Sequence, residues 1–308
     1  MKKNVLTAAC LATVLALVAT ACHDVIFDEI RKEVKLTDAQ VSGDINSIVE
    51  FNGYLYVQNG NILRKELKNK DGTWTAPYDG QWTTASRTGM ESGIVIKLAA
   101  NDSNLYALVA RIEEDEDEGE NIVAEQTLYT STDGSNWTIV SGVTLTRTGN
   151  QLYSLDGSAY IRNDNKIIYT LTGENATEGG VAYQIKAGAY TASDKTIYKD
   201  GSVFYNNIGS TIYSIALTSD CLIVGTASGL KYVTISSPKE ITVANSASAL
   251  SSYYEVHCVF AASLDRPAQD SDIYATAIFE GTSSNTGASA DNQGLWAYYP
   301  GRGHWNRE

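Results

Sequence analysis

Proline is scarce in this chain of 308 residues, which contains 4 prolines and 25 glycines. Turns must therefore rely on glycine, asparagine, aspartate and serine, each of which favours turn conformations for its own physical reason. Sustained helical periodicity is also missing after the first 22 residues, and only the stretch at 26–36 fits a short helix, or alternatively an edge strand. Short apolar runs bounded by turn residues make up the rest, which predicts an all-β chain.

The residues of common catalytic and metal sites are few. His23, His257 and His304 are the histidines, and they fall in different parts of the chain, with His257 expected in a strand that lines a central channel. Neither a G-x-S-x-G nucleophile motif nor a C-x-x-C pair is present. The sequence therefore predicts no catalytic residue, no metal site and no cofactor.

Cysteine is also rare, with 4 residues. Cys10 and Cys22 belong to the first 22 residues, which leaves Cys221 and Cys258 in apolar, strand-like runs. We expect these two to be separate buried thiols, because an unpaired cysteine packs as a small hydrophobe. A disulfide between them is the alternative in an oxidising compartment.

Positive charge is in deficit, since 23 Lys and Arg face 36 Asp and Glu for a formal net charge of −13. Nucleic acid and anionic membrane surfaces attract clustered basic residues, so this balance disfavours both as partners. Seven of the eight residues at 113–120, "EEDEDEGE", are carboxylates.

The N-terminus has the pattern of an export signal. Lys2 and Lys3 precede an apolar run from Val5 to Ala19, and small residues lead to Cys22. This stretch resembles a bacterial lipoprotein signal, although Ala19 stands where the usual motif has leucine, a relaxed form similar to the lipoboxes of spirochaetes. The resemblance implies removal of residues 1–21, lipidation of Cys22 and stable anchoring by more than one acyl chain. An ordinary secretory signal cut after Ala21 and a transmembrane anchor are the alternatives.

A repeat of about fifty residues follows this segment. Each copy has an apolar first strand, a second strand with a Leu-Tyr or Ile-Tyr pair, a third strand, and often a short fourth strand. Aligned second-strand positions are Tyr56, Tyr106, Tyr169, Ile223 and Tyr274; expected fourth strands lie at 72–77, 135–140, 239–243 and 303–308.

Repeated four-stranded units predict a β-propeller over 45–308 with five four-stranded blades, joined to the lipid by a linker at 22–44. Six blades are the alternative, with segments near 82–86 and 196–207 supplying the extra one. A β-sandwich or two small β domains would also fit a chain of short strands. How the ring closes is left open.

"STDGSNW" at 131–137 carries a second resemblance. Ser131, Asp133, Gly134 and Trp137 resemble the Asp-box hairpin of sialidases and other propellers, shortened by one residue between the aspartate and the glycine. We expect the aspartate to cap the turn, the glycine to adopt a left-handed conformation and the tryptophan to pin the hairpin to its sheet. With the relaxed lipobox, this hairpin makes the chain resemble the Asp-box-like propeller lipoproteins of spirochaetes. The resemblance implies a lipid-anchored extracytoplasmic propeller, on the periplasmic side or the outer surface of a diderm bacterium. It does not assign a catalytic residue to this chain.

Three long insertions are predicted in connections between second and third strands, which share one face of a propeller. That face is the predicted partner-binding face, because insertions on one side of a repeat fold often mark a binding surface. Its candidate residues are Glu113, Glu114, Asp115, Glu116, Asp117, Glu118, Glu120, Glu174, Asn175, Glu178, Asn285 and Asp291. A calcium site in the acidic run is disfavoured by its spacing, and a solvated loop is the simplest reading of that run.

These features predict a monomeric binding or scaffold protein for a protein or glycan partner at the cell envelope. A glycan-acting enzyme such as a sialidase-like hydrolase or a lyase is the alternative, and it requires arginines that converge on a central pocket; the candidates are Arg87, Arg147, Arg162 and Arg266. A purely structural envelope lipoprotein is the third possibility.

Overall fold

The computed structural model describes residues 41–67, 81–114, 121–241, 250–279, 293–300 and 304–308. Within these ranges six antiparallel sheets follow one another along the chain, and each has four strands hydrogen-bonded in sequence order. No helix of the described ranges has the length and apolar character that crossing a membrane requires.

The first three sheets span the N-terminal half of the described chain. Sheet 1 contains β1 (Ile48–Phe51), β2 (Tyr54–Gln58), β3 (Ile62–Glu66) and β4 (Thr83–Thr84). Sheet 2 contains β5 (Ile94–Ala100), β6 (Leu105–Glu114), β7 (Asn121–Ser131) and β8 (Thr138–Ile139). Sheet 3 contains β9 (Gln151–Leu155), β10 (Ser158–Arg162), β11 (Ile168–Thr172) and β12 (Asn175–Glu178).

The other three sheets follow the same plan. Sheet 4 contains β13 (Ile185–Ala187), β14 (Tyr190–Ser193), β15 (Thr196–Lys199) and β16 (Ser202–Tyr205). Sheet 5 contains β17 (Ile212–Leu217), β18 (Cys221–Thr226), β19 (Gly229–Thr234) and β20 (Glu240–Ile241). Sheet 6 contains β21 (Val259–Ala261), β22 (Ile273–Ala277), β23 (Gly294–Tyr299) and β24 (His304–Arg307), with the short helix η2 (Ala268–Asp270) between its first two strands.

Tight turns without proline connect several of these strands. Asn52–Gly53, Asp156–Gly157 and Asp200–Gly201 each occupy a two-residue hairpin loop, and all six residues have positive φ. Two consecutive positive-φ residues define the turn that matches the twist of paired strands, and Asn-Gly and Asp-Gly adopt it most readily. The prediction that glycine, asparagine and aspartate form the turns is confirmed at these three hairpins.

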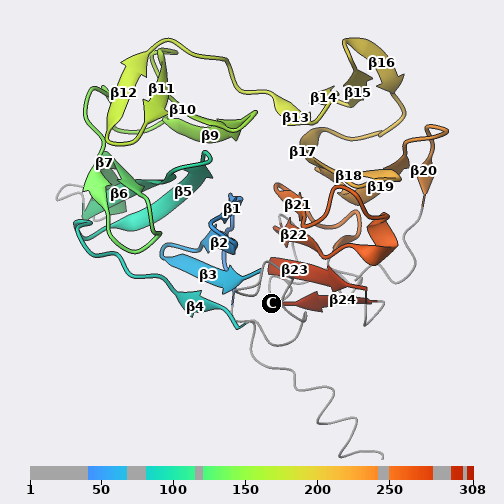
Figure 1. Cartoon of the computed structure of the whole chain (residues 1–308), viewed down its shortest axis with the longest axis horizontal. Coiled ribbons are helices and arrows are strands. Elements are labelled where there is room, and N and C mark those ends of the chain that lie inside the picture. The colour runs from blue at the N-terminus through green and yellow to red at the C-terminus, as the bar shows by residue number, and fades with distance from the viewer. Residues whose placement is uncertain (1–40, 68–80, 115–120, 242–249, 280–292, 301–303) are drawn as a thin grey trace, which may run out of the picture. The chain divides into compact units, whose positions relative to one another are not determined.

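Buried apolar clusters join neighbouring sheets side by side. In the described ranges five such clusters connect sheets 1 and 2, 2 and 3, 4 and 5, 5 and 6, and 6 and 1. The first strands β1, β5, β9, β13, β17 and β21 lie innermost around a common centre, and the fourth strands lie outside (Figure 1). Six radially arranged four-stranded sheets with the first strand at the centre make residues 41–308 a six-bladed β-propeller.

Sheets 6 and 1 close the ring through a dense seam. Val41 donates its backbone N–H to the carbonyl oxygen of Glu308 at 3.0 Å, and Leu295 donates to the carbonyl oxygen of Val41 at 3.3 Å. Inside the seam Lys65 forms an ion pair of 2.7 Å with Glu308, and both side chains are more than nine-tenths buried. Among the described residues, closure therefore combines backbone hydrogen bonds of Val41, apolar packing and a buried charge pair.

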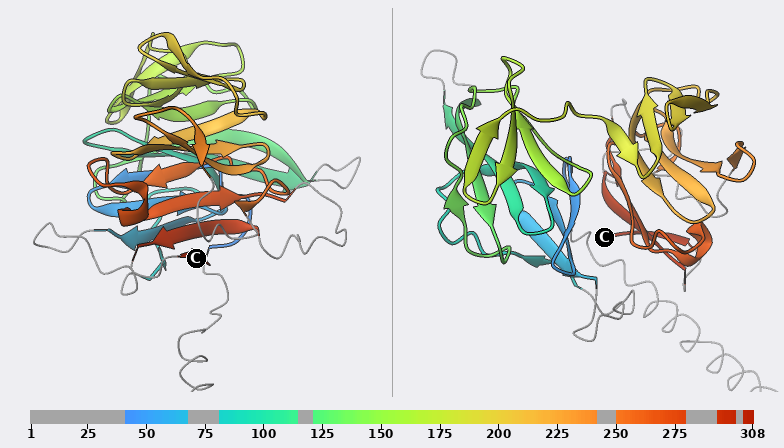
Figure 2. Two further views of the ribbon diagram at one scale, coloured as in Figure 1. Left: turned by 90° about the vertical axis from the view of Figure 1, so that its right-hand side faces the viewer. Right: turned by 45° about the horizontal axis from the view of Figure 1, so that its top comes forward.

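The junction between sheets 3 and 4 differs from the other five junctions in its packing. No buried apolar cluster among the described residues joins them. They are linked by the exposed segment 179–184 and by an ion pair between Lys186 and Asp156. Figure 2 shows sheet 3 in green and sheet 4 in yellow joined by one crossing segment.

The prediction of five blades is wrong, and the six-bladed alternative is confirmed. The error arose at 151–155, which was not recognised as the first strand of sheet 3, so later segments of that sheet were assigned one strand too early. Tyr169 consequently lies in the third strand β11 rather than in a second strand. Segment 181–188 leads into the first strand of sheet 4, and 196–207 supplies its outer strands, as the alternative proposed.

Three of the four predicted outer strands are confirmed. Those at 135–140, 239–243 and 303–308 contain β8, β20 and β24. The expected strand at 72–77 lies outside the described residues, and the strand paired with β3 is β4 at 83–84. The segment at 82–86 therefore belongs to sheet 1 and not to an additional blade.

Candidate functional site

The central channel has two chemically different ends. Residues of the first-to-second turns of sheets 1 to 4 line one cavity together, and we call this end of the channel the turn end. Links between sheets and second-to-third connections gather at the other, the loop end. Each end contains a cavity.

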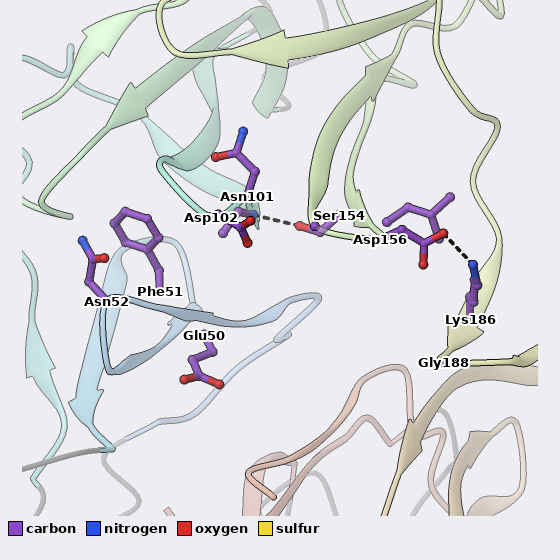
Figure 3. Close-up of a pocket in the computed structure, with 12 residues that line it drawn as sticks. Glu50, Phe51, Asn52, Asn101, Asp102, Ser154, Asp156, Lys186 and Gly188 are labelled. Atoms are coloured by element: carbon purple, nitrogen blue, oxygen red, sulfur yellow. Dashed lines mark hydrogen bonds and ion pairs between the residues drawn. The ribbon is translucent and has the colours of Figure 1, made fainter. Parts of the chain in front are cut away.

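The turn-end cavity measures about 500 Å³ and is acidic. Glu50, Asp102 and Asp156 come from three different sheets and line the cavity together with one lysine, Lys186, which pairs with Asp156 (Figure 3). Ser154 accepts a hydrogen bond from the backbone N–H of Ala100 at 2.8 Å and ties sheet 3 to sheet 2 at this rim. Three carboxylates and one ammonium give the lining a negative formal charge.

The loop-end cavity measures about 410 Å³ and is rich in aromatic rings. Its lining consists of Asn46, Ile96, Lys97, Leu108, Asn150, Gln151, Leu152, Tyr153, Tyr183, Tyr213, His257 and Cys258. Most of these residues lie in a first strand or just before one, because the starts of the first strands meet at this end.

Two ring pairs form the aromatic part of the lining. Tyr183 meets Tyr153 edge to face, with ring centroids 5.4 Å apart and an interplanar angle of 73°. Tyr213 and His257 lie 4.4 Å apart at 48°. Tyrosine and histidine present an apolar ring and a polar tip together, which suits a site that contacts a ligand on both kinds of surface.

A carboxylate holds the second ring pair in place. His257 Nε2 hydrogen-bonds with Glu255 Oε2 at 2.6 Å, and the hydroxyl of Tyr213 donates to Glu255 Oε1 at 3.2 Å. Lys97 donates from Nζ to the backbone carbonyl oxygen of Asn46. Burial raises the pKa of Tyr153, so its hydroxyl stays protonated at neutral pH.

The two cysteines of the described chain are both free thiols. Cys221 is buried in β18, and Cys258 is partly buried at the loop-end cavity. Burial raises the pKa of each thiol, that of Cys221 to about 11, which keeps it protonated and unreactive at neutral pH.

The predicted binding residues do not form one cluster. Glu113 and Glu114 end β6 at the loop end, where Arg111 pairs with Glu113 and, at 3.5 Å, with Glu125. Asp115, Glu116, Asp117, Glu118, Glu120, Asn285 and Asp291 lie outside the described residues.

The assignment of Glu174, Asn175 and Glu178 to a second-to-third connection is wrong. Glu174 lies in the turn between β11 and β12, at the turn end, and the other two belong to β12, an outer strand. Ser141 donates its backbone N–H to the carbonyl oxygen of Glu174 at 2.8 Å and its hydroxyl to Asn175. This segment therefore holds sheet 3 against sheet 2, and the missed first strand at 151–155 explains the error.

Sequence reasoning placed His257 at the channel but missed the other aromatic residues of the loop-end cavity. Tyr153 was missed together with β9, and Tyr183 was placed inside sheet 3 instead of at the start of sheet 4. The available signal was a polar or aromatic residue near the start of each first strand, such as Tyr183 two residues before β13 and Tyr213 as the second residue of β17. This signal can be recognised only when the number of blades is known.

The Asp-box-like hairpin lies at the turn between β7 and β8, away from both cavities. Asp133 Oδ1 accepts the backbone N–H groups of Ser135 and Asn136, each at 2.8 Å, and Gly134 has a φ of 70°. Trp137 is buried and donates from its indole N–H to the carbonyl oxygen of Ser86 at 3.1 Å. The hairpin fastens the outer edge of sheet 2 to the link from sheet 1, which is a structural role.

Arginine is absent from both cavity linings as far as the described residues define them. Arg162 donates to the side chain of Gln151, a lining residue of the loop-end cavity, at 3.2 Å. Arg87 and Arg147 instead bond to backbone carbonyls at Gly93 and Val123. The described linings thus lack the convergent arginines that the sialidase-like alternative requires.

Fold and cavities together define the class: a six-bladed β-propeller with a polar cavity at each end of its channel. No family model and no curated protein matches the sequence. Among solved structures, the WD40 β-propeller domain of Doa1 is similar at 11% identity and a TM-score of 0.41, over 87% of this chain and 84% of that one. YjhT is similar at 13% identity and a TM-score of 0.35, over 85% and 81%. A GH43 protein from Bacillus licheniformis is similar at 10% identity and a TM-score of 0.35, over 85% of this chain and 53% of its own.

Proposed function

We propose that this chain is a lipid-anchored, extracytoplasmic binding propeller that holds a glycan or protein partner at the loop end of its channel. The observation that carries the proposal is the loop-end cavity, where the rings of Tyr153, Tyr183, Tyr213 and His257 surround about 410 Å³ of space. Concave sites with aromatic walls and a few fixed polar groups are typical of ligand binding.

The position of the cavity supports binding to something outside the ring. The long connection between β6 and β7, with the carboxylates of Glu113 and Glu114 at its start, leaves sheet 2 at the loop end. The connection between β22 and β23 leaves sheet 6 at the same end. The described ends of these strands therefore lie on the side of the ring where the cavity opens.

Catalysis is less well supported at this end. Glycoside hydrolysis commonly uses two carboxyl groups separated by roughly 5–9.5 Å. The described loop-end cavity has one adjacent carboxylate, Glu255, and it already bonds to His257 and Tyr213. Binding without turnover is the simpler use of this arrangement.

Site-specific photocrosslinking in intact cells tests the proposal. Benzoylphenylalanine replaces Tyr183 in one variant and Tyr253 in a control, since both side chains are about half exposed, at 50% and 54%, and only Tyr183 lines the cavity. We expect ultraviolet light to give a covalent adduct of higher mass at position 183 and none at position 253. Equal adduct formation at both positions, or none at 183, would contradict binding at this cavity.

A Cys22→Ser variant tests the anchor in the same cells. We expect wild-type protein in the membrane fraction and the variant in the soluble fraction, because the acyl chains supply the membrane affinity. Retention of the variant in the membrane fraction would overturn lipid attachment at Cys22.

A further inference from the structure

Tyr183 presents an exposed ring, and its edge-to-face contact with the buried Tyr153 fixes the orientation of that ring. Its side chain is 50% exposed, while Tyr153 beneath it is only 5% exposed. Tyr153 in turn donates its hydroxyl to the carbonyl oxygen of Val181 at 2.6 Å and stacks on Tyr160 at 5.5 Å. An exposed aromatic face that its neighbours hold still loses little conformational entropy when a ligand stacks on it.

A second wall of the cavity comes from other sheets. Tyr213 is the second residue of β17 in sheet 5, His257 precedes the first strand of sheet 6, and Glu255 bonds to both. A ligand between Tyr183 and this wall would touch residues from the link between sheets 3 and 4, from sheet 5 and from sheet 6. The cavity therefore offers apolar ring surface on two sides of one small ligand.

The charges at this cavity balance. Lys97 in the lining contributes one positive charge. Glu255, which is next to the lining and bonds to Tyr213 and His257, contributes one negative charge. The turn-end cavity differs, because Glu50, Asp102 and Asp156 outnumber Lys186 there. The whole chain carries a formal charge of −13, which repels anions. A ligand that fits the loop end is accordingly polar but uncharged.

Polar contacts at the cavity suit hydroxyl groups. Gln151, Lys97 and Tyr213 all line it. Each polar group already has one internal partner, Arg162 for the Gln151 amide oxygen, the Asn46 carbonyl for the Lys97 ammonium and Glu255 for the Tyr213 hydroxyl, and each keeps further hydrogen-bonding capacity. An amide side chain both donates and accepts, as a hydroxyl does, so the two pair in either direction. The partly positive C–H groups on one face of a sugar ring meet the negative face of an aromatic ring favourably.

From these features we infer that the loop-end cavity binds a neutral saccharide, with Tyr183 as its stacking surface; this inference rests on the proposed function and names its ligand class. The volume of about 410 Å³ is near the lower end of the roughly 300–1,000 Å³ range of ligand pockets. It suits one or two sugar units of a longer glycan rather than a large ligand.

Titration of the purified full chain with defined sugars tests the inference. The protein is kept in a detergent without a sugar headgroup, and binding is measured by calorimetry and saturation-transfer NMR. Probes are the methyl glycosides of glucose, galactose, mannose and N-acetylglucosamine, with glucuronate and glucosamine as charged counterparts. We expect at least one neutral glycoside to bind about tenfold more tightly than either charged sugar.

Three variants separate stacking from folding. Tyr183→Ala is expected to weaken binding about tenfold because the stacking surface is lost, whereas Tyr183→Phe keeps the ring and stays within about threefold of wild type. Tyr253→Ala, equally exposed and outside the cavity, should bind as wild type does. Binding that Tyr183→Ala leaves intact, or the failure of every neutral glycoside to bind, overturns the inference. If photocrosslinking at position 183 gives an adduct that a protease degrades, the partner is a protein. That result together with no sugar binding would support the proposed function and refute this inference.

Discussion

Asp133 shows how much a single exposed carboxylate contributes to one turn. It accepts hydrogen bonds from the backbone N–H groups of Ser135 and Asn136, from the Asn136 amide at 2.7 Å and from the Ser131 hydroxyl at 3.0 Å. These bonds, with those from Asn136 the strongest, hold its pKa well below the usual range. A depressed pKa in the folded protein means that the ionised form stabilises the fold.

Asp133→Ala is expected to lower the free energy of unfolding by about 1 kcal/mol at neutral pH, because the turn loses its acceptor. The pKa of Asp133 is lower in the folded chain than in the unfolded chain, where it is about 3.9. The stabilisation is therefore complete above that value and is lost as the pH falls from about 4 toward the folded pKa. Urea unfolding of wild type and variant at a series of pH values measures the difference.

Asp164→Ala is the control for this prediction, since that exposed aspartate pairs only loosely with Lys166, at 3.5 Å. A difference between wild type and Asp133→Ala that stays constant from pH 7 down to pH values well below about 4 would show that the charge of Asp133 contributes nothing.

Local chemistry was predictable at this scale where it depends on neighbours in sequence. All residues that form the Asp133 turn are near neighbours in sequence, including Ser131 and Gly134, so the sequence alone predicts the turn. Glu174 was not predictable in the same way, because its position depends on which strand of sheet 3 precedes it. Its partner Ser141 lies 33 residues earlier, in the connection from sheet 2.

At the scale of the elements, the seam between sheets 6 and 1 depends on a lysine that the sequence would place in solvent. Lys65 stands in β3 and is 5% exposed, with Tyr299 and Glu308 as hydrogen-bond partners. Burial raises the pKa of Tyr299, which stays protonated and donates to Glu308 at 2.6 Å. Trp82 donates to the same carboxylate at 2.8 Å, so four residues from two sheets form one buried network.

Lys65→Met is expected to lower the free energy of unfolding by about 3–5 kcal/mol, because it leaves the Glu308 carboxylate buried without its cation. The double variant Lys65→Met with Glu308→Gln should recover part of this loss, since both charges are then removed. Lys231→Met breaks a more exposed pair with Glu240 and should cost about 0–1 kcal/mol. Equal losses for Lys65→Met and Lys231→Met in urea unfolding would contradict the role assigned to this network.

The strands themselves were largely predictable, because alternation and turn residues are local signals. Sheet 4 was the exception: its strands have 3 or 4 residues each, and Val203 in β16 is exposed. Short strands with mixed burial give a weak pattern. The five-blade prediction therefore placed 181–188 in sheet 3 and assigned 196–207 to no blade. Once one first strand is missed, every later face assignment in that repeat is reversed.

On the scale of the whole molecule, the ring consists of two sets of three sheets, and the two junctions between these sets differ in how much apolar surface they bury. Sheets 1–3 share two buried clusters, sheets 4–6 share two more, and a fifth joins sheets 6 and 1. Between sheets 3 and 4 the segment 179–184 is exposed at every residue. By contrast, the link from sheet 4 to sheet 5 contains Ile208, which is fully buried.

This asymmetry predicts where the chain tolerates a break. A site-specific protease sequence inserted between Ala182 and Tyr183 should allow cleavage into two pieces that stay together in native buffer, because the seam between sheets 6 and 1 still holds them. Size-exclusion chromatography should show one species, and far-ultraviolet circular dichroism should be unchanged. The same insertion between Gly209 and Ser210 should lower the urea midpoint, since it disturbs the packing of Ile208.

The seam between sheets 6 and 1 can be tested in the protein cleaved after Ala182. Adding Lys65→Met should let the two pieces separate, because it removes the buried ion pair from the one apolar seam, among the described residues, that still joins them. Pieces that elute apart without that substitution would show that the link at 179–184, rather than the closing seam, holds the ring together.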